Sequence, residues 1–130
     1  RTFFYKKVPS EKHRAIYETV RRANAAAEAI LKPGVPLCEV DKAARQIIED
    51  AGYGPNFTHR LGHFIGLEVH EYGDVSSANT KVAEVGNIFS IEPGIYVEGE
   101  VGVRIEDLVL ITEDGCEILN SFSKELDIVE

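Results

Sequence analysis

The chain has 130 residues, of which 44% are hydrophobic and 28% charged, and its formal net charge at pH 7 is -8. This length suits one globular domain, and the composition differs from that of disordered chains and of membrane-spanning ones. The charge is uneven, because residues 1–50 carry ten Lys or Arg against seven Asp or Glu, whereas residues 51–130 carry four against fifteen. An acidic second half argues against a nucleic acid as partner, since phosphates need clustered basic residues, and it suits a cation better.

Two amphipathic helices are predicted in the first half of the chain. Residues 10–31 place apolar side chains at steps of three and four, with Ser10 as the N-cap and a Pro-Gly pair as the stop. Residues 37–50 repeat the pattern, and Gly52 lies where a C-terminal cap is expected.

From about residue 57 onward the apolar period changes to two, which predicts strands. The β-rich runs are residues 63–70, 87–92, 95–98 and 101–112. An Asp-Gly pair predicts a hairpin turn after the last of them. Helices that precede a mostly antiparallel sheet indicate the α+β class, and no repeat or linker divides the chain.

The ends of the chain and its cysteines add two expectations. The sequence contains no Met and begins with Arg1, so we interpret it as part of a longer protein, and the opening RTFFYKK is typical of the end of a strand. Cys38 and Cys116 are far apart and no signal peptide precedes them, so we expect reduced thiols and a cytoplasmic location. No apolar run is long enough for a membrane helix, so no membrane partner is expected.

Three of the four histidines lie in one stretch, THRLGHFIGLEVHEYG, residues 58–73. His59, His63 and His70 are separated there by glycines that disfavour a helix, which predicts an extended, bulged segment. The segment is predicted to be packed because of its apolar residues, Phe64, Ile65, Leu67 and Val69. Imidazoles clustered in such a segment point to a metal site or a catalytic site, although short histidine motifs also match by chance.

Two glutamates follow in apolar strands. In VGVRIEDLVLIT, strand alternation places Glu106 on the same face as Arg104 and two leucines, where a carboxylate needs a cation or hydrogen bonds. In NIFSIEPGIYV, Glu92 ends an apolar strand before Pro93. An ion pair between Arg104 and Glu106, and a solvent-facing strand end at Glu92, are the ordinary structural explanations. One imidazole and two carboxylates on neighbouring strands are also the ligand set that suits Mn, Co, Fe or Zn in hydrolytic sites.

Three motifs together carry a resemblance to a known family. HRLGHFIGLEVHE, FSIEPGIY and GVRIEDLVLIT, in that order and spacing, resemble the creatinase, prolidase and methionine aminopeptidase superfamily of pita-bread metallopeptidases. The match is closest to the branch of Xaa-Pro dipeptidase (prolidase) and aminopeptidase P. The resemblance implies a partial pita-bread fold, with two helices packed on a mostly antiparallel, curved sheet. It also implies hydrolysis of Xaa-Pro peptide bonds by a hydroxide that two divalent metal ions activate, with Mn favoured over Co, Fe or Zn.

The same resemblance assigns roles to individual residues. Those that match metal ligands of the family are His63, Glu92 and Glu106. Glu106 matches the carboxylate that bridges two ions, and Arg104 beside it resembles an active-site arginine. His59 and His70 match histidines that line the substrate pocket without binding metal. The resemblance implies that His70 stabilises the tetrahedral intermediate or the reacting amide.

The chain departs from the family pattern in two respects. The family's first two metal ligands are aspartates on strands that precede the segment resembling RTF, so residues 1–130 match the C-terminal part of the catalytic domain. We therefore expect the isolated chain to lack Xaa-Pro peptidase activity and to form a homo-oligomer through its N-terminal strand. Second, the loop EYGDVSSANTK holds Lys81 as its only cation, where some prolidases carry an arginine. The preference for dipeptides or longer peptides therefore stays open.

Other functions share parts of this pattern. A methionine aminopeptidase is the nearest enzymatic alternative. A metal-free creatinase-like hydrolase or a peptide-binding paralogue has the same fold, but this chain keeps ligands that such proteins would lose. A generic α+β domain with a structural ion pair explains Arg104 and Glu106 but not the histidines.

Overall fold

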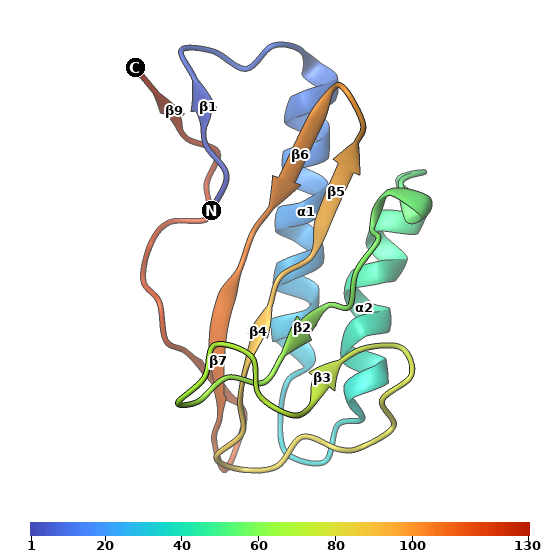
Figure 1. Cartoon of the computed structure of the whole chain (residues 1–130), viewed down its shortest axis with the longest axis vertical. Helices are drawn as coiled ribbons and strands as arrows, with labels where there is room; N and C mark the ends of the chain where they lie inside the picture. The colour runs from blue at the N-terminus through green and yellow to red at the C-terminus, as the bar shows by residue number, and fades with distance from the viewer.

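A computed structural model describes residues 1–130 as two α-helices and nine short β-strands (Figure 1). The helices are α1 (Glu11–Ile30) and α2 (Leu37–Asp50), and a 3-10 turn, η1 (Gly54–Asn56), follows them. The strands are β1 (Phe4–Tyr5), β2 (Gly62–His63), β3 (Asp74–Val75), β4 (Ile88–Ile91), β5 (Gly94–Val97), β6 (Val101–Arg104), β7 (Asp107–Ile111), β8 (Cys116–Ile118) and β9 (Ile128–Val129). The α+β class with a mostly antiparallel sheet is confirmed.

The helices begin and end where the sequence predicts. The Ser10 side chain caps α1 by accepting a hydrogen bond of 3.3 Å from the backbone N–H of His13. Just past the end of α2, Gly52 adopts a φ of +85°, a left-handed conformation that glycine takes without steric cost. Neither helix combines the length and the apolar run that crossing a lipid bilayer requires.

Two long antiparallel strands form the centre of the sheet, and each is interrupted at the same level. The pairing of β4 with β7 sets Ile91 opposite Asp107, and the pairing of β5 with β6 sets Gly94 opposite Arg104. These pairs belong to one continuous register. β4 with β5 therefore forms one long strand, and β6 with β7 forms another. β2 lies beside β4, and β3 and β8 extend the sheet on either side.

The two faces of the central strands differ as strand alternation predicts. α1 packs on β4, β5 and β6, and α2 packs on β3 (Figure 1). The residues of the second long strand that face the helices are fully buried: Val103, Ile105, Asp107, Val109 and Ile111. The alternate residues, Arg104, Glu106, Leu108 and Leu110, lie on the opposite, more exposed face. The hydrophobic core therefore separates the helices from the face that carries Glu106.

The predicted strand over residues 63–70 is wrong beyond its first residues. β2 covers only Gly62–His63, and the chain then forms a tight loop in which the N–H of Gly66 donates to the carbonyl of Glu68 at 3.1 Å. Leu67 and Val69 are exposed, so the prediction that they pack is also wrong. The strand ends there because only two residues of β3, Asp74 and Val75, pair with β2.

The predicted N-terminal strand is present as β1. It pairs in parallel with β9, and the N–H of Phe4 donates to the carbonyl of Asp127 at 3.0 Å. Figure 1 shows this pair at one end of the molecule, beside the long strands. One edge of β1 is thus occupied by another segment of the same chain. Self-association through β1 stays a prediction.

Candidate functional site

Glu92 and Glu106 lie in the two interruptions of the long strands, directly opposite each other. The continuous register of the two strand pairs sets Glu92 against Glu106. Side chains at opposed positions of antiparallel strands share a face, with Cβ atoms about 5 Å apart, and like charges there are destabilising. Two facing carboxylates therefore indicate a place for a cation.

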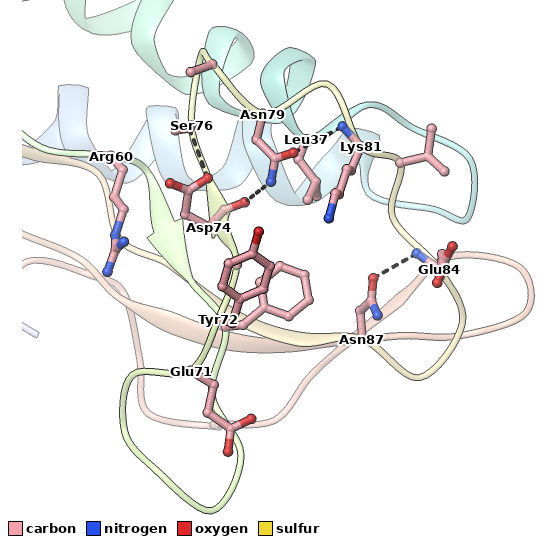
Figure 2. Close-up of a pocket in the computed structure, with 14 residues that line it drawn as sticks. Leu37, Arg60, Glu71, Tyr72, Asp74, Ser76, Asn79, Lys81, Glu84 and Asn87 are labelled. Atoms are coloured by element: carbon pink, nitrogen blue, oxygen red, sulfur yellow. Dashed lines mark hydrogen bonds between the residues drawn. The ribbon is translucent and has the colours of Figure 1, made fainter.

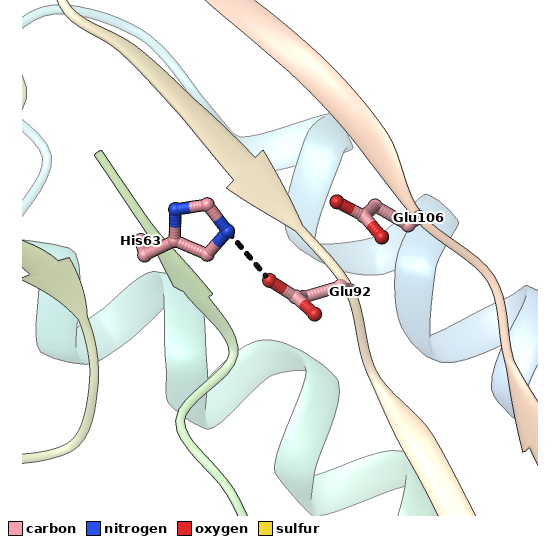
Figure 3. A group of neighbouring side chains, drawn as sticks. All are labelled: His63, Glu92 and Glu106. Carbon is pink, nitrogen blue, oxygen red and sulfur yellow. Dashed lines mark ion pairs between the residues drawn. The ribbon is translucent and has the colours of Figure 1, made fainter. Parts of the chain in front are cut away.

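β2 brings His63 to the same place. Gly62 allows the close approach of β2 to β4, because a Cβ atom at this position would lie 1.8 Å from the carbonyl oxygen of Ser90. His63 Nε2 lies 3.3 Å from Glu92 Oε1. One potential ligand atom from each of His63, Glu92 and Glu106 lies within 4.8 Å of the other two (Figure 3). The structure thus brings all three predicted metal ligands together.

The hydrogen bonds around His63 leave its Nε2 lone pair free for a cation. Nδ1 lies 2.9 Å from the carbonyl oxygen of Phe64, which can only accept, so Nδ1 carries the proton. Ser90 fixes the neighbouring groups, since it accepts from the His63 N–H at 2.9 Å and donates to Glu92 Oε1 at 2.8 Å. Metal-binding histidines commonly donate their second ring N–H to a carbonyl in this way. The three side chains therefore fit a divalent ion.

A second set of side chains connects His59 to the Glu92 carboxylate through Tyr96 and Arg104. His59 Nδ1 donates to the carbonyl of Arg60 at 2.7 Å, so its Nε2 accepts the hydroxyl proton of Tyr96, also at 2.7 Å. The Tyr96 oxygen in turn accepts from Arg104 Nε at 2.7 Å, and Arg104 Nη1 lies 3.5 Å from Glu92 Oε2. The predicted residues His59 and Arg104 therefore meet at one phenol.

Tyr96 was missed in the sequence, where it looks like an ordinary strand aromatic. Two glycines make room for it, because a Cβ at Gly94 would lie 2.3 Å from the Tyr96 hydroxyl and one at Gly102 would lie 3.3 Å from its ring. Glycines on both sides of an aromatic residue in paired strands were the available signal. A side chain at Gly94 would collide with the Tyr96 hydroxyl, and one at Gly102 would crowd the ring.

The ion pair of Arg104 differs from the one that sequence alternation suggested. Arg104 pairs with Glu92, and no ion pair joins it to Glu106. The hydrogen bond to Tyr96, together with the neighbouring Glu92 and Glu106 charges, raises the pKa of Arg104 above its ordinary value despite partial burial. Arg104 therefore stays cationic, and it leaves the Glu106 carboxylate without a basic partner.

His70 lies beside the three candidate ligands without belonging to them. Its ring centroid is 4.2 Å from that of His63, and the two rings are tilted by 53°. The side chain is exposed, at the end of the loop that follows β2. This position agrees with the prediction that His70 faces a substrate, which stays a prediction.

Comparison with known proteins places the chain in a family. Residues 1–113 match metallopeptidase family M24. The chain belongs to this family. An uncharacterized peptidase of Staphylococcus haemolyticus is 54% identical over 116 residues, which make up 89% of this chain and 33% of that protein. The M24 chain therefore spans about a third of the length of the curated relatives it matches.

Solved structures agree with the family. The prolidase from Pyrococcus horikoshii OT3 is 46% identical with a TM-score of 0.89, over 92% of this chain and 34% of that one. The X-Pro aminopeptidase from Thermotoga maritima MSB8 is 41% identical with a TM-score of 0.90, over 94% of this chain and 35% of that one. The resemblance to pita-bread metallopeptidases, and to their prolidase and aminopeptidase P branch, is confirmed. Members of family M24 depend on divalent metals, which agrees with the donor set in this M24 chain.

A groove of the M24 chain is lined by none of the three candidate ligands. It has a volume of about 990 Å³, and its lining includes Phe64. Asp74 of β3 and Asn79 and Lys81 of the loop that follows also line it (Figure 2). Tyr72 projects over the groove, and the Nζ of Lys81 lies 5.6 Å from the centroid of its ring. Lys81, the only cation of its loop, thus borders this groove and not the cluster of His63, Glu92 and Glu106.

A buried charge cluster on the helix side of the sheet was also missed. Lys124 Nζ lies 2.6 Å from Glu28 Oε2 and 2.8 Å from Asp107 Oδ2, and Arg1 Nη2 lies 2.6 Å from Asp107 Oδ1. Burial, and then the hydrogen bond with Asp107, raises the pKa of Glu28 to about 7. Although burial acts in the opposite direction, hydrogen bonds from Glu28, Lys124 and Arg1 lower the pKa of Asp107 to about 2. The alternation that placed Asp107 on the apolar face was the signal for this cluster.

Proposed function

We propose that the protein carrying this chain is a peptidase that hydrolyses Xaa-Pro bonds with divalent metal ions held in part by His63, Glu92 and Glu106. The observation that carries this proposal is the pair of facing carboxylates with the His63 Nε2 lone pair beside them. Solved relatives described as a prolidase and an X-Pro aminopeptidase support the choice of bond. Mn is the favoured metal, with Co, Fe or Zn also suited to one imidazole and two carboxylates.

The protein side chains have separate tasks in this proposal. A bound divalent ion supplies a Lewis acid that polarises a carbonyl and lowers the pKa of water. His70, exposed beside His63, is in position to donate a hydrogen bond to the reacting amide. Arg104 orients the Glu92 carboxylate through their ion pair, and Tyr96 fixes the Arg104 guanidinium with respect to His59. In this proposal His59 and His70 line the substrate pocket, and His63 is a metal ligand.

The number of ligands limits what this chain does by itself. Three side chains hold one ion weakly, whereas a two-metal site needs further carboxylates for the second ion. We propose that two aspartates outside residues 1–130 complete a dinuclear site. The chain spans 33% of a curated relative, which leaves room for them in a longer protein. In this proposal residues 1–130 are the C-terminal part of a catalytic domain, inactive in isolation.

Two further proposals concern the state of the protein. We propose a cytoplasmic location, which the free thiols of Cys38 and Cys116 support. We also propose a homo-oligomer. The exposed rings of Phe3, Tyr5 and Phe122 around β1 support an apolar contact there.

The test is a metal-dependent assay of the protein that carries this chain. After chelation, we expect no cleavage, and added Mn should restore cleavage of Xaa-Pro dipeptides or of longer Xaa-Pro peptides but not of Xaa-Ala peptides. Glu92→Gln should abolish the response to Mn, whereas Glu98→Gln, an exposed glutamate near the β5–β6 turn, should not.

Other outcomes would favour the alternatives. Cleavage of an N-terminal Met from Met-Ala peptides, without Xaa-Pro cleavage, would favour a methionine aminopeptidase. Hydrolysis that persists in chelator would favour a metal-free creatinase-like enzyme.

A further inference from the structure

The backbone segment that carries His59 is held by two side chains of α2. The carbonyl oxygens of Phe57 and His59 accept hydrogen bonds from the Arg45 guanidinium, at 3.1 Å and 3.0 Å. The N–H of Leu61 donates to Asp41 Oδ1 at 3.2 Å. These three groups belong to every second residue of the segment 57–61, which lies between η1 and β2 and bends at His59 and Leu61. Asp41 and Arg45 therefore supply the hydrogen-bond partners for these three backbone groups.

Asp41 and Arg45 lie one turn apart on α2 and form a close, two-bond ion pair. Arg45 Nε lies 2.8 Å from Asp41 Oδ2, and Arg45 Nη2 lies 3.0 Å from Asp41 Oδ1. The Asp41 side chain is 0% exposed. The guanidinium also lies 4.1 Å from the centroid of the Phe57 ring. The position of the guanidinium is thus fixed by two contacts, the hydrogen bonds to the Asp41 carboxylate and the packing against the Phe57 ring.

The other edge of the held segment meets the strand with a metal ligand. The carbonyl of Leu61 accepts from the N–H of Glu92 at 2.8 Å, and β2 with His63 follows directly. His59 extends from the middle of the segment to the Tyr96 hydroxyl. A displacement of the His59 backbone would therefore move its imidazole away from Tyr96 while β2 and β4 keep their own contacts.

We propose that Asp41 and Arg45 are positioning residues for the hydrolytic reaction, which hold residues 57–61 so that His59 meets Tyr96 beside the metal ligands. This inference rests on the proposed peptidase function. If Arg45 served only to stabilise α2, its two hydrogen bonds to the Asp41 carboxylate would be sufficient. Arg45 also places donors on the carbonyl of His59 itself, and a Lys side chain lacks the planar fork for such a set.

The test compares Arg45→Lys with Arg21→Lys in the protein that carries this chain. Arg21 is a matched control, because its Nε makes a bond of 2.8 Å to Glu18 within α1 but contacts no backbone of the site. Arg45→Lys should lower kcat by about tenfold to a hundredfold, since small misplacements far from the chemistry have effects of this size. KM and bound Mn should match the wild type. Arg21→Lys should change none of these quantities.

A spectroscopic measurement separates positioning from general stability. In the wild type, His59 carries its proton on Nδ1 because of the Arg60 carbonyl, and Nε2 accepts from Tyr96. The ring 15N signals of His59 in selectively labelled protein report this tautomer. In Arg45→Lys these signals should shift toward those of a free imidazole. The signals of His63 should stay unchanged.

Each outcome decides the inference. If kcat in Arg45→Lys equals that of the control, or if kcat falls while the His59 signals stay fixed, the inference is wrong. A loss of bound Mn that accounts for the lost activity also overturns it. If Arg45→Lys does not fold, Asp41→Asn combined with Arg45→Gln leaves no unpaired buried charge and takes its place in both measurements. If the wild type cleaves no Xaa-Pro bond, the proposed function fails, and the His59 signals alone decide the inference.

Discussion

Replacing Glu106 by Gln should stabilise the metal-free protein and abolish its stabilisation by metal. Glu106 faces Glu92 across the central strands, and Arg104 pairs with Glu92 only. Without a metal ion, the Glu106 charge therefore contributes repulsion. With a metal ion, the same charge contributes a ligand. The change should have opposite effects on the two states.

The size of the repulsion follows from the geometry. The ligand atoms of Glu92 and Glu106 lie within 4.8 Å of each other. Two unit charges at such a distance interact by about 3.5 kcal/mol at an effective dielectric constant of about 20, and by about 1 kcal/mol in water. Glu106 is partly exposed and Arg104 lies near Glu92, so we expect the lower value. Metal at about a hundredfold its Kd stabilises the wild type by about 2.7 kcal/mol, and Glu106→Gln should lose this gain.

Urea unfolding with chelator and with excess Mn measures both effects. In chelator, the midpoint for Glu106→Gln should lie above that of the wild type, and Mn should not raise it further. Glu98→Gln is the control for the loss of one exposed carboxylate. If Glu106→Gln instead lowers the midpoint in chelator, Glu106 has a stabilising partner in the metal-free protein, and the assignment as a metal ligand loses its physical basis.

Three further predictions concern other parts of the molecule. His70→Ala should lower kcat and keep most of the bound Mn, whereas His63→Ala should lose the metal; equal metal loss in both variants would show that the two roles are assigned wrongly. Glu28 has a pKa of about 7 against an ordinary 4.5, so the folded protein holds a proton that the unfolded chain releases, and the free energy of unfolding should fall as pH rises between these values. In urea unfolding, the decline in the wild type should reach up to roughly 3 kcal/mol between pH 5 and pH 8, and Glu28→Gln should remove it. A variant with the same pH dependence as the wild type would contradict this assignment to Glu28. The purified 130-residue chain should show no appreciable Xaa-Pro turnover with excess Mn and should self-associate in sedimentation, and turnover like that of an intact family member would contradict the need for further ligands.

Local patterns in the sequence were sufficient for the helices and for the faces of the central strands. The cap at Ser10 and the alternation from Val103 to Ile111 depend on neighbours a few residues away. The loop after His63 shows where this reasoning fails. Ile65, Leu67 and Val69 alternate as in a strand, but strand formation also needs a paired backbone, and β3 is too short to provide one.

The sequence predicted which three side chains meet at the candidate site, but not the hydrogen bonds that connect them to their neighbours. His63, Glu92 and Glu106 could be named because their motifs are specific. The bond between Tyr96 and His59 joins residues 37 positions apart in the chain, and Lys124 reaches Glu28 across 96 positions. Contacts of this kind depend on the packing of whole elements, and no local pattern encodes them. Two weaker signals were present in the sequence: Asp107 is a charge on an apolar face, and glycines lie around Tyr96.

The central claim is that His63, Glu92 and Glu106 together bind divalent metal. The most direct test is anomalous diffraction at the Mn edge from crystals of the protein that carries this chain, grown with Mn. We predict an anomalous peak within bonding distance of His63 Nε2 and of both carboxylates, with His70 and His59 outside that distance. A peak elsewhere in the protein, with Glu106 turned toward solvent and the space between the two glutamates filled by water alone, would contradict the account.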